Sequence, residues 1–347
     1  MSGKIGFSCM KVISVSIFML LFQVAEAQYD FGGLDQFLQK NQKQLGGNVV
    51  ALVWKDGKMI YQKELGEFNA KTQAPIASSS KWLTAALVMT FVDQGKLDLD
   101  EPVNKYLPVF NKYMKSYVTL RHCLTHTTGI ERDTKLAAKL LDRKKYETLE
   151  EEVNAIAAKE ISNNPQQEFF YGGYGLNIAA RVCEIVGKKT FDRLIQERIT
   201  RPLKMKGTNF SNDNGGAPNP SGGAQSTAND YMNFMIMILN KGVFEGKRIL
   251  NEASIAEMQK AQFPDLPVKY SPAAAAGFKY GLGEWIQESD DNGKAMVISS
   301  PGLFGTWPYI DLKHNYAAIL FVKSILGEQK KEIAIGFKNI IDDTISQ

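Results

Sequence analysis

The stretch "PIASSSKWLTAALVM" (residues 75–89) places three serines directly before a lysine, at the start of an apolar segment. Residues 79–94 are apolar nearly all round, and Gly95 follows as a C-cap, so we expect a buried helix here. A serine hydroxyl becomes a good nucleophile when a neighbouring base takes its proton. Residues i and i+3 share a helix face, and of the three serines only Ser78 has a lysine at that spacing, Lys81. The spacing therefore selects Ser78 as a candidate nucleophile and Lys81 as its base.

The local sequence leaves two interpretations of this pair open. In the first, burial lowers the pKa of Lys81 toward that of a usable base, and the helix N-terminus offers positive potential to a developing oxyanion. In the second, Ser78 caps the helix and Lys81 extends to solvent. The pattern is not specific by itself, because Ser8 and Lys11 near the N-terminus match it as well.

Other segments that carry chemically active side chains follow in order. They are "VTLRHCLTHTTGI" (118–130), "FYGGYGLNIAARVCEIVGKKTFDRLIQERITRPLKMKGTNF" (170–210), "GGAQSTANDYMNFMIMILNKG" (222–242), "YGLGEW" (280–285) and "SSPGLFGTWPYID" (299–311). Together with residues 75–108, they resemble the serine β-lactamase-like family. That family includes class C β-lactamases, D-Ala-D-Ala carboxypeptidases and related penicillin-binding proteins, D-aminopeptidases and β-lactamase-like esterases. The resemblance covers roughly residues 45 to 325, about four-fifths of the chain.

Members of this family have three catalytic elements: Ser-x-x-Lys, then Tyr-x-Asn or Ser-x-Asn, then Lys-x-Gly or His-x-Gly. The resemblance implies that Ser78 is acylated and that Lys81 activates it. It also implies that Tyr171, in "FFYGGYG", is the tyrosine of the second element. A phenolate there could accept the serine proton and return it to the leaving group, or deprotonate the deacylating water. Alternatively, Tyr171 packs on Phe169 and Phe170 at the start of a helix.

Two positions depart from the family pattern. Gly173 stands where the second element has asparagine, and it has no side chain to bind a substrate amide. Ser300, in Ser-Pro-Gly, stands where the third element has lysine or histidine. Its hydroxyl can donate one hydrogen bond but cannot pair with a substrate carboxylate as a cation does. These departures favour esters over β-lactams and D-Ala-D-Ala peptides, whose carboxylate is a recognition group.

The family's oxyanion hole is made of backbone and is unaffected by these departures. The resemblance implies that its donors are the amides of Ser78 and Leu303, and such a donor is typically worth about 3 kcal/mol of transition-state stabilisation. Gly302 would let this strand approach the ligand closely. Trp307 either lines the substrate pocket or packs in the core. We interpret His122 and His126 as hydrogen-bonded structural histidines.

The order of the elements predicts an α+β fold, and the resemblance implies that it is of the β-lactamase/penicillin-binding-protein type. Residues 48–65 read as a hairpin around Asp56-Gly57, and four strand-like segments return after about residue 278. We therefore expect one antiparallel sheet built from both chain ends and flanked by helices, with a helical domain inserted. The predicted divisions are a signal peptide (1–27), an α/β sheet domain (28–85 and 276–347) and a mostly helical domain (86–275).

The N-terminal 27 residues read as a secretory signal. Lys4 and Lys11 precede the apolar run "VISVSIFMLLF", and "AEA" then offers small residues at the cleavage site. We expect a mature protein that starts near Gln28, is periplasmic or extracellular, and has no stable membrane insertion. Cys123 and Cys183 lie in apolar helical patterns, and the sequence leaves open whether they pair.

Charge and composition exclude several other functions. The formal charge of +4 is small for 347 residues and lacks basic runs with interleaved aromatics, which argues against nucleic acid as a partner. Three histidines without metal-ligand spacing argue against a metal site, and the chemistry needs no cofactor.

The sequence thus predicts a secreted serine hydrolase that acts on a small-molecule carboxylic ester or related acyl substrate. The alternatives are a D-amino-acid peptidase, a carboxypeptidase or a β-lactamase. From another class, the alternative is a catalytically impaired module that binds cell-wall peptide or penicillin.

Overall fold

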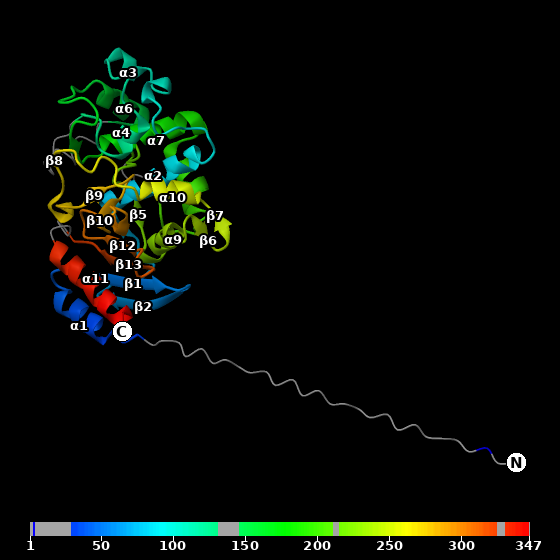
Figure 1. Cartoon of the computed structure of the whole chain (residues 1–347), viewed down its shortest axis with the longest axis vertical. Coiled ribbons are helices and arrows are strands. Elements are labelled where there is room, and N and C mark those ends of the chain that lie inside the picture. The colour runs from blue at the N-terminus through cyan, green and yellow to red at the C-terminus, as the bar shows by residue number, and fades with distance from the viewer. Residues whose placement is uncertain (1–2, 4–28, 131–145, 211–214, 325–329, 347) are drawn as a thin grey trace.

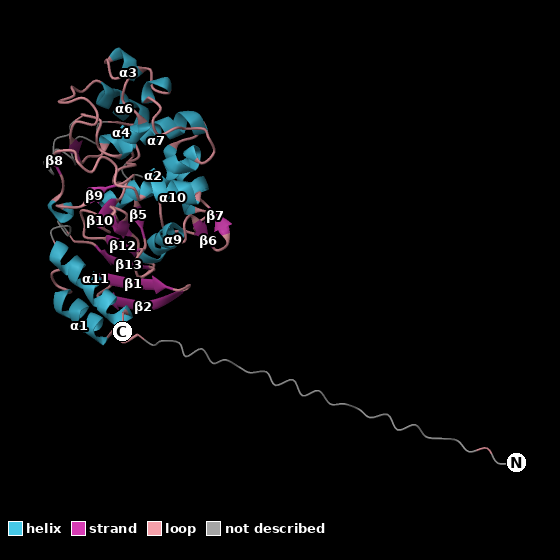
Figure 2. Cartoon of the chain, in the orientation of Figure 1, coloured by secondary structure: helices cyan, strands magenta, loops and turns pink. Residues whose placement is uncertain are grey.

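The computed structural model describes residues 3, 29–130, 146–210, 215–324 and 330–346 (Figure 1). Apart from residue 3, the predicted signal peptide lies outside the described residues. The remainder forms an α+β fold in which the main sheet and the helices α1, α9 and α11 lie toward one end of the molecule and the helices α3, α4, α6 and α7 toward the other (Figure 2). Among the described residues, no helix combines the length and apolarity needed to cross a membrane.

The main sheet has seven strands in the order β2-β1-β13-β12-β11-β10-β9. β1 pairs antiparallel with β13 along its whole length, from Val49 opposite Val322 to Lys55 opposite Tyr316. The predicted sheet of strands from both chain ends is therefore confirmed. The strands are β1 (Val49–Lys55), β2 (Lys58–Leu65), β9 (Lys279–Tyr280), β10 (Trp285–Ser289), β11 (Ala295–Ser299), β12 (Trp307–Asp311) and β13 (Tyr316–Val322).

The predicted hairpin between β1 and β2 is also confirmed. Asp56 and Gly57 both have positive φ, at 49° and 84°, the backbone geometry that an Asp-Gly pair accepts most readily in a two-residue turn. This turn places Lys55 opposite Lys58 and so fixes the start of the β1–β2 pairing.

Helix α2 (Ser80–Val92) is the buried helix that the opening stretch predicts. Every residue from Ser80 to Phe91 is buried, and Gly95 ends the segment with a φ of 63°. α7 and α8 pack against α2, whereas α9 packs against β1, β12 and β13. The other helices of this region are α3 (Val109–Lys112), α4 (Leu120–Leu124), α6 (Leu149–Ala157), α7 (Tyr174–Gly187), α8 (Phe191–Ile195), α9 (Ala228–Leu239) and α10 (Glu252–Met258).

The opposite face of the sheet is covered by α1 (Gly32–Asn41) and α11 (Lys331–Ile345), which pack on each other (Figure 1). The main core cluster lies on the side of the sheet that faces α2 and α9. It includes Trp82 of α2 and Phe321 of β13. The domain boundaries at 85/86 and 275/276 stay a prediction. α9 belongs by sequence to the predicted helical part, although it packs on the sheet.

Short elements join these layers. Two-residue strands form three small pairs: β3 (Ala74–Pro75) with β5 (Gln225–Ser226), β6 (Val243–Phe244) with β7 (Lys247–Arg248), and β4 (Phe169–Phe170) with the three-residue β8 (Val268–Tyr270). The helical turns are η1 (Ala77–Ser79), η2 (Val103–Lys105), η4 (Gln196–Thr200) and η5 (Ala273–Ala275). The β3–β5 and β4–β8 pairs position the candidate site.

Candidate active site

The side chains of Ser78 and Lys81 face each other at the start of α2. Lys81 Nζ lies 3.2 Å from Ser78 Oγ and donates a 2.7 Å hydrogen bond to the Ser221 carbonyl. Lys81 is only 4% exposed. The interpretation in which Lys81 extends to solvent is therefore excluded, and the amine is held where it could take the proton from Ser78.

The backbone turns sharply just before Ser78. Ala77 has a φ of 46°, in the left-handed region that costs a non-glycine residue about 1–2 kcal/mol. Two hydrogen bonds hold the turn: Ile76 N donates to Ala224 O at 3.0 Å, and Ser79 N donates to Ile76 O at 3.1 Å. Strain of this kind persists only where surrounding structure enforces it, which is typical of functional sites.

The other two serines connect the start of the helix to two distant loops. Ser79 Oγ donates a 2.6 Å hydrogen bond to the Ser300 carbonyl. Ser80 Oγ donates to Ala77 O at 2.6 Å and accepts from Ala224 N at 3.0 Å. The three serine hydroxyls thus have different partners. The Ser78 hydroxyl faces Lys81, whereas those of Ser79 and Ser80 bond to backbone groups.

The loop before β5 supplies a group that the sequence analysis missed. The Ser221 carbonyl accepts the Lys81 hydrogen bond, and the Pro220 carbonyl accepts a 2.6 Å hydrogen bond from Thr84 Oγ1 one helical turn further on. The β3–β5 pair holds this loop beside α2. Every residue has a backbone carbonyl, so the sequence does not show which one accepts a hydrogen bond from Lys81. The Gly222-Gly223 pair that follows Ser221 indicates only that a loop lies here.

The segment after β11 lies directly against the start of α2. A Cβ on Gly302 would come within 2.3 Å of the Ile76 carbonyl oxygen and 3.2 Å of Ser79 Oγ, so only glycine fits there. Ser300 is 3% exposed, and its carbonyl is the acceptor for Ser79. Gly302 therefore packs against the start of α2, which brings the neighbouring Leu303 to the nucleophile's end of that helix, whereas the expected approach of Gly302 to a ligand stays a prediction. The roles of Leu303 and Ser300 toward substrate stay predictions.

Tyr171 reaches the same place from β4. β4 pairs in parallel with β8, and Tyr171 N donates to Tyr270 O at 3.0 Å. Lys81 Nζ lies 4.8 Å from the centre of the Tyr171 ring. The structure therefore brings Ser78, Lys81 and Tyr171 together. Gly173, two residues on, is the N-cap of α7.

His126 supports Tyr171 from behind. Its ring centre lies 4.6 Å from that of Tyr171, its Nδ1 accepts from Gly172 N at 3.4 Å, and its Nε2 lies 3.0 Å from Tyr280 Oη. Burial, together with the charge of Lys81, holds the pKa of His126 well below its usual range. A neutral ring whose two nitrogens both have partners fits the structural role we expected.

His122 has a structural role in α4. Its Nδ1 accepts from Thr119 N at 3.1 Å while its own amide donates to Thr119 Oγ1 at 3.2 Å, which together form a capping box. Burial lowers the pKa of His122 to about 4.

Trp307 packs behind the sheet, so of the two interpretations that the sequence left open, the structure supports packing in the core over a place in the substrate pocket. Along β12, Trp307 and Tyr309 point to the α1 and α11 side of the sheet, whereas Ile310 belongs to the core on the other side. Trp307 is 1% exposed and stacks on Tyr309, which in turn contacts Phe337 of α11. Alternation along the strand therefore places Trp307 in the packed layer behind the sheet.

Glu284, in the segment "YGLGEW", is a buried carboxyl close to α2 that the sequence analysis did not single out. The neighbouring Gly283 lies so close to α2 that a Cβ would meet Ala85 Cβ at 2.5 Å. Glu284 has no exposed surface, and neither carboxyl oxygen has a hydrogen-bond partner of good geometry. Burial raises the pKa of Glu284 well above its ordinary value, and the Trp82 indole opposes this only partly.

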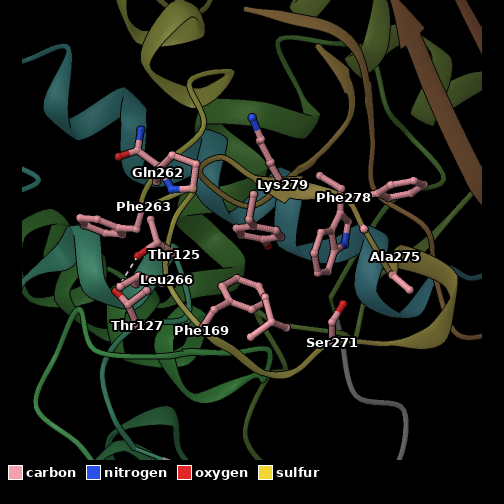
Figure 3. Close-up of a pocket in the computed structure, with 16 residues that line it drawn as sticks. Thr125, Thr127, Phe169, Gln262, Phe263, Leu266, Ser271, Ala275, Phe278 and Lys279 are labelled. Atoms are coloured by element: carbon pink, nitrogen blue, oxygen red, sulfur yellow. Dashed lines mark hydrogen bonds between the residues drawn. The ribbon is translucent and has the colours of Figure 1, made fainter. Parts of the chain in front are cut away.

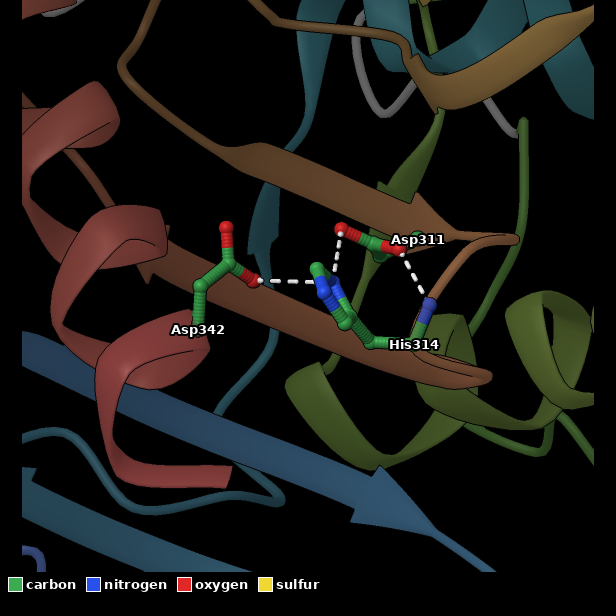
Figure 4. Close-up of side chains that lie close together, drawn as sticks. All are labelled: Asp311, His314 and Asp342. Atoms are coloured by element: carbon green, nitrogen blue, oxygen red, sulfur yellow. Dashed lines mark hydrogen bonds and ion pairs between the residues drawn. The ribbon is translucent and has the colours of Figure 1, made fainter. Parts of the chain in front are cut away.

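The described residues contain one group of three side chains with metal-ligand geometry, Asp311, His314 and Asp342 (Figure 4). Lys338 Nζ lies 3.1 Å from Asp311 Oδ2 and 2.6 Å from Asp342 Oδ2. One ammonium therefore lies between the two carboxylates and offsets part of their charge, and the group works as an ion-pair network that joins α11 to the sheet. Cys123 and Cys183 are buried free thiols, and burial raises the pKa of both.

Comparison with known proteins agrees with this geometry. The family model described as Beta-lactamase matches residues 34–334. The chain is 25% identical over 330 residues to the D-alanyl-D-alanine-carboxypeptidase/endopeptidase AmpH of Escherichia coli K12, covering 86% of this chain and 85% of that protein. The chain therefore belongs to the Beta-lactamase family and is a serine hydrolase of that family.

Two solved structures show the same fold. A protein from Bacteroides dorei DSM 17855, provisionally described as a β-lactamase, superposes with a TM-score of 0.80 at 29% identity, covering 92% of this chain and all of that one (100%). EstCE1, described as a hydrolase with promiscuous acyltransferase activity, superposes with a TM-score of 0.70 at 18% identity, covering 89% and 99%. At that identity the second likeness shows the fold alone.

Proposed function

We propose that this protein hydrolyses carboxylic esters through an acyl-enzyme on Ser78. The 3.2 Å contact between Lys81 Nζ and Ser78 Oγ at a buried site supports the proposal most directly. Lys81 takes the hydroxyl proton while Oγ attacks the ester carbonyl, and the amides of Ser78 and Leu303 stabilise the oxyanion. Tyr171 passes the proton to the leaving alcohol as the carbon–oxygen bond breaks. Water then hydrolyses the acyl-enzyme and releases the acid.

The two positions that differ from the family pattern, Gly173 and Ser300, support an ester as the substrate over a molecule that is recognised through a carboxylate. Ser300 offers a hydroxyl rather than a cation, and Gly173 offers no side chain. An ester lacks the negative group that a cation in the third element would bind, so it loses less from this change. EstCE1 supports the idea that this fold accommodates general acyl chemistry.

A D-amino-acid peptidase is the second candidate. It is favoured by one observation, the 25% identity to a D-alanyl-D-alanine-carboxypeptidase/endopeptidase over most of both chains. Cell-wall peptide would then be the substrate, and its carboxylate would need a binding group other than residue 300.

We also propose export to the periplasm or the extracellular space, with processing near Gln28. The support is the apolar run and small-residue site of the N-terminal 27 residues. Mass spectrometry of the protein isolated from its native cells tests it: an N-terminus at Met1 in the mature pool would contradict export by this signal.

The test of the reaction uses a fluorophosphonate probe, a nitrophenyl ester, a chromogenic cephalosporin and a D-Ala-D-Ala peptide. Each is given to the wild type, to Ser78→Ala and to Ser116→Ala, an exposed serine that serves as the matched control. We expect labelling and ester turnover that Ser78→Ala abolishes and Ser116→Ala leaves intact. Turnover of only the cephalosporin or only the peptide would overturn the ester preference, and activity independent of Ser78 would overturn the mechanism.

A further inference from the structure

A cavity of about 500 Å³ opens next to the candidate active site, between the segment around β8 and strands β9 and β10 (Figure 3). Its volume falls within the range of pockets that bind small organic ligands. The lining is dominated by large apolar and aromatic side chains: Phe169, Phe263, Leu266, Phe278, Tyr280 and Trp285.

Four polar side chains of the lining, those of Thr125, Thr127, Gln262 and Tyr280, already have hydrogen-bond partners within the protein. Thr125 Oγ1 donates to the Arg121 carbonyl at 2.7 Å and lies 2.9 Å from Thr127 Oγ1 (Figure 3). Gln262 Oε1 accepts from Arg121 at 2.9 Å, and Tyr280 Oη is bonded to a histidine nitrogen. Among the lining residues that the structure describes, Lys279 alone carries a charge, and it is exposed. The cavity therefore suits an uncharged apolar group.

Aromatic rings join the wall of this cavity to the acylation centre. Trp285 and Tyr280 line the cavity, and their ring centres lie 5.1 and 6.0 Å from that of Tyr171. Ser78 Oγ lies 3.2 Å from Lys81 Nζ, and Lys81 Nζ lies 4.8 Å from the centre of the Tyr171 ring. The centres of the Tyr171 and Trp285 rings are 5.1 Å apart, so Ser78 Oγ lies at most about 13 Å from the centre of the Trp285 ring. An extended chain advances about 1.2 Å per bond, so about ten atoms span that distance.

We propose that this cavity binds the apolar tail of the substrate's leaving alcohol. The inference rests on the proposed ester hydrolysis, in which Tyr171 gives a proton to the leaving oxygen. That oxygen must then lie beside Tyr171, and a tail that continues past Tyr171 reaches Trp285 and the cavity that Trp285 lines. The acyl group is attached on the other side of the scissile bond. The substrate class is therefore an ester of a long aliphatic or arylalkyl alcohol.

Alkyl acetates from ethyl to decyl test the inference, because all of them form the same acetyl-enzyme and differ only in the leaving alcohol. We expect kcat/KM to change little for short alcohols and then to rise by up to about fourfold per methylene once the tail enters the cavity. A series of ethyl esters with lengthening acyl chains should show no such threshold.

Two variants alter the cavity and one serves as the control. Ser271→Trp fills it from a half-exposed loop position, and Leu266→Ala removes an apolar contact. Lys269→Trp introduces the same indole at an exposed position of β8 outside the lining. We expect Ser271→Trp to lower kcat/KM for decyl acetate at least tenfold and that for ethyl acetate less than twofold, with Lys269→Trp unchanged on both. Leu266→Ala should show a smaller loss on decyl acetate alone.

A binding measurement separates this inference from the proposed function. Decan-1-ol is titrated into Ser78→Ala protein with and without Ser271→Trp, and binding is followed by calorimetry. Binding that Ser271→Trp weakens at least tenfold supports the cavity as the tail site. If decanol does not bind, or binds equally to both proteins, the inference is overturned even when ester turnover depends on Ser78. If decanol binds in the cavity but no ester is turned over through Ser78, the proposed function fails, and the assignment of a leaving-group site fails with it.

Discussion

Replacing Ser79 by alanine tests how the oxyanion segment is held in place. The Ser79 hydroxyl is fully buried and donates a 2.6 Å hydrogen bond to the carbonyl of Ser300, which is itself 3% exposed. The same oxygen lies 3.2 Å from where a Cβ on Gly302 would stand. Ser79→Ala therefore removes both the donor to this segment and the atom against which the segment packs.

The expected effects follow from these contacts. A buried carbonyl that loses its hydrogen bond costs about 1–3 kcal/mol of folding free energy. Deleting an oxyanion donor costs about 100- to 1,000-fold in kcat. Ser79→Ala displaces the segment that carries Leu303 without deleting its amide, so we expect a smaller acylation loss of about 5- to 100-fold.

The assay is the second-order rate constant for labelling by a fluorophosphonate, whose tetrahedral product mimics the acylation transition state. Thr84→Val is the matched control, because Thr84 Oγ1 also donates a 2.6 Å hydrogen bond from α2 to a loop carbonyl, that of Pro220. Both variants should unfold at lower denaturant concentration, but Ser79→Ala should label more slowly than Thr84→Val. Equal labelling rate constants would refute the argument that the Ser79 hydroxyl positions the oxyanion segment.

Three further predictions use the same site. Lys81→Met should lower the fluorophosphonate labelling rate constant at least about 100-fold, since it removes the base at 3.2 Å from Ser78 Oγ, and a labelling rate near that of the wild type would rule Lys81 out as the base. Glu284→Gln should stabilise the protein relative to the wild type, and increasingly so as the pH rises. The pKa of Glu284 in the folded protein lies well above the ordinary 4.5, so its contribution to the stability of the wild type is fully present below pH 4.5. Above pH 4.5 the wild type loses about 1.4 kcal/mol of folding free energy per pH unit until the pH reaches the folded pKa. Thermal melts between pH 4 and pH 8 measure this, and a constant difference in midpoint would contradict the sign. Ala77→Val should destabilise the protein relative to Ala77→Gly by at least about 1 kcal/mol in urea unfolding, because the φ of 46° excludes a β-branched residue and suits glycine; equal stabilities would mean that the turn relaxes.

The fold was predictable from the sequence because its determinants are local patterns. Asp56-Gly57 favours a tight turn, residues 79–94 favour a helix with no polar face, and strand patterns at both chain ends favour a shared sheet. The position of Trp307 was not predictable in the same way. A five-residue strand buried on both faces has no polar side to show which residues point to which core. The structure places Trp307 on the α1 and α11 side.

The candidate nucleophile and its base were predictable because they are side chains at a fixed helical spacing. The groups around them were not, since most are backbone atoms brought in from far along the chain. The Ser221 carbonyl that receives Lys81 is 140 residues away, and the Ser300 carbonyl that receives Ser79 is 221 residues away. No residue type marks a carbonyl, so only the tertiary structure identifies these two acceptors.

This construction explains how the site can tolerate its two departures from the family pattern. The nucleophile, the base and the expected oxyanion amides depend on the turn at Ala77 and on hydrogen bonds from α2 to loop carbonyls, none of which uses the side chain of residue 173 or 300. Changes at those two positions can therefore alter substrate recognition without disturbing the acylation machinery. If recognition no longer rests on a charged contact at residue 300, it has to come from another surface near Tyr171. Under the proposed function, the rings of Tyr280 and Trp285 with the apolar cavity would provide such a surface, which would favour substrates recognised by shape and apolar area rather than by a carboxylate.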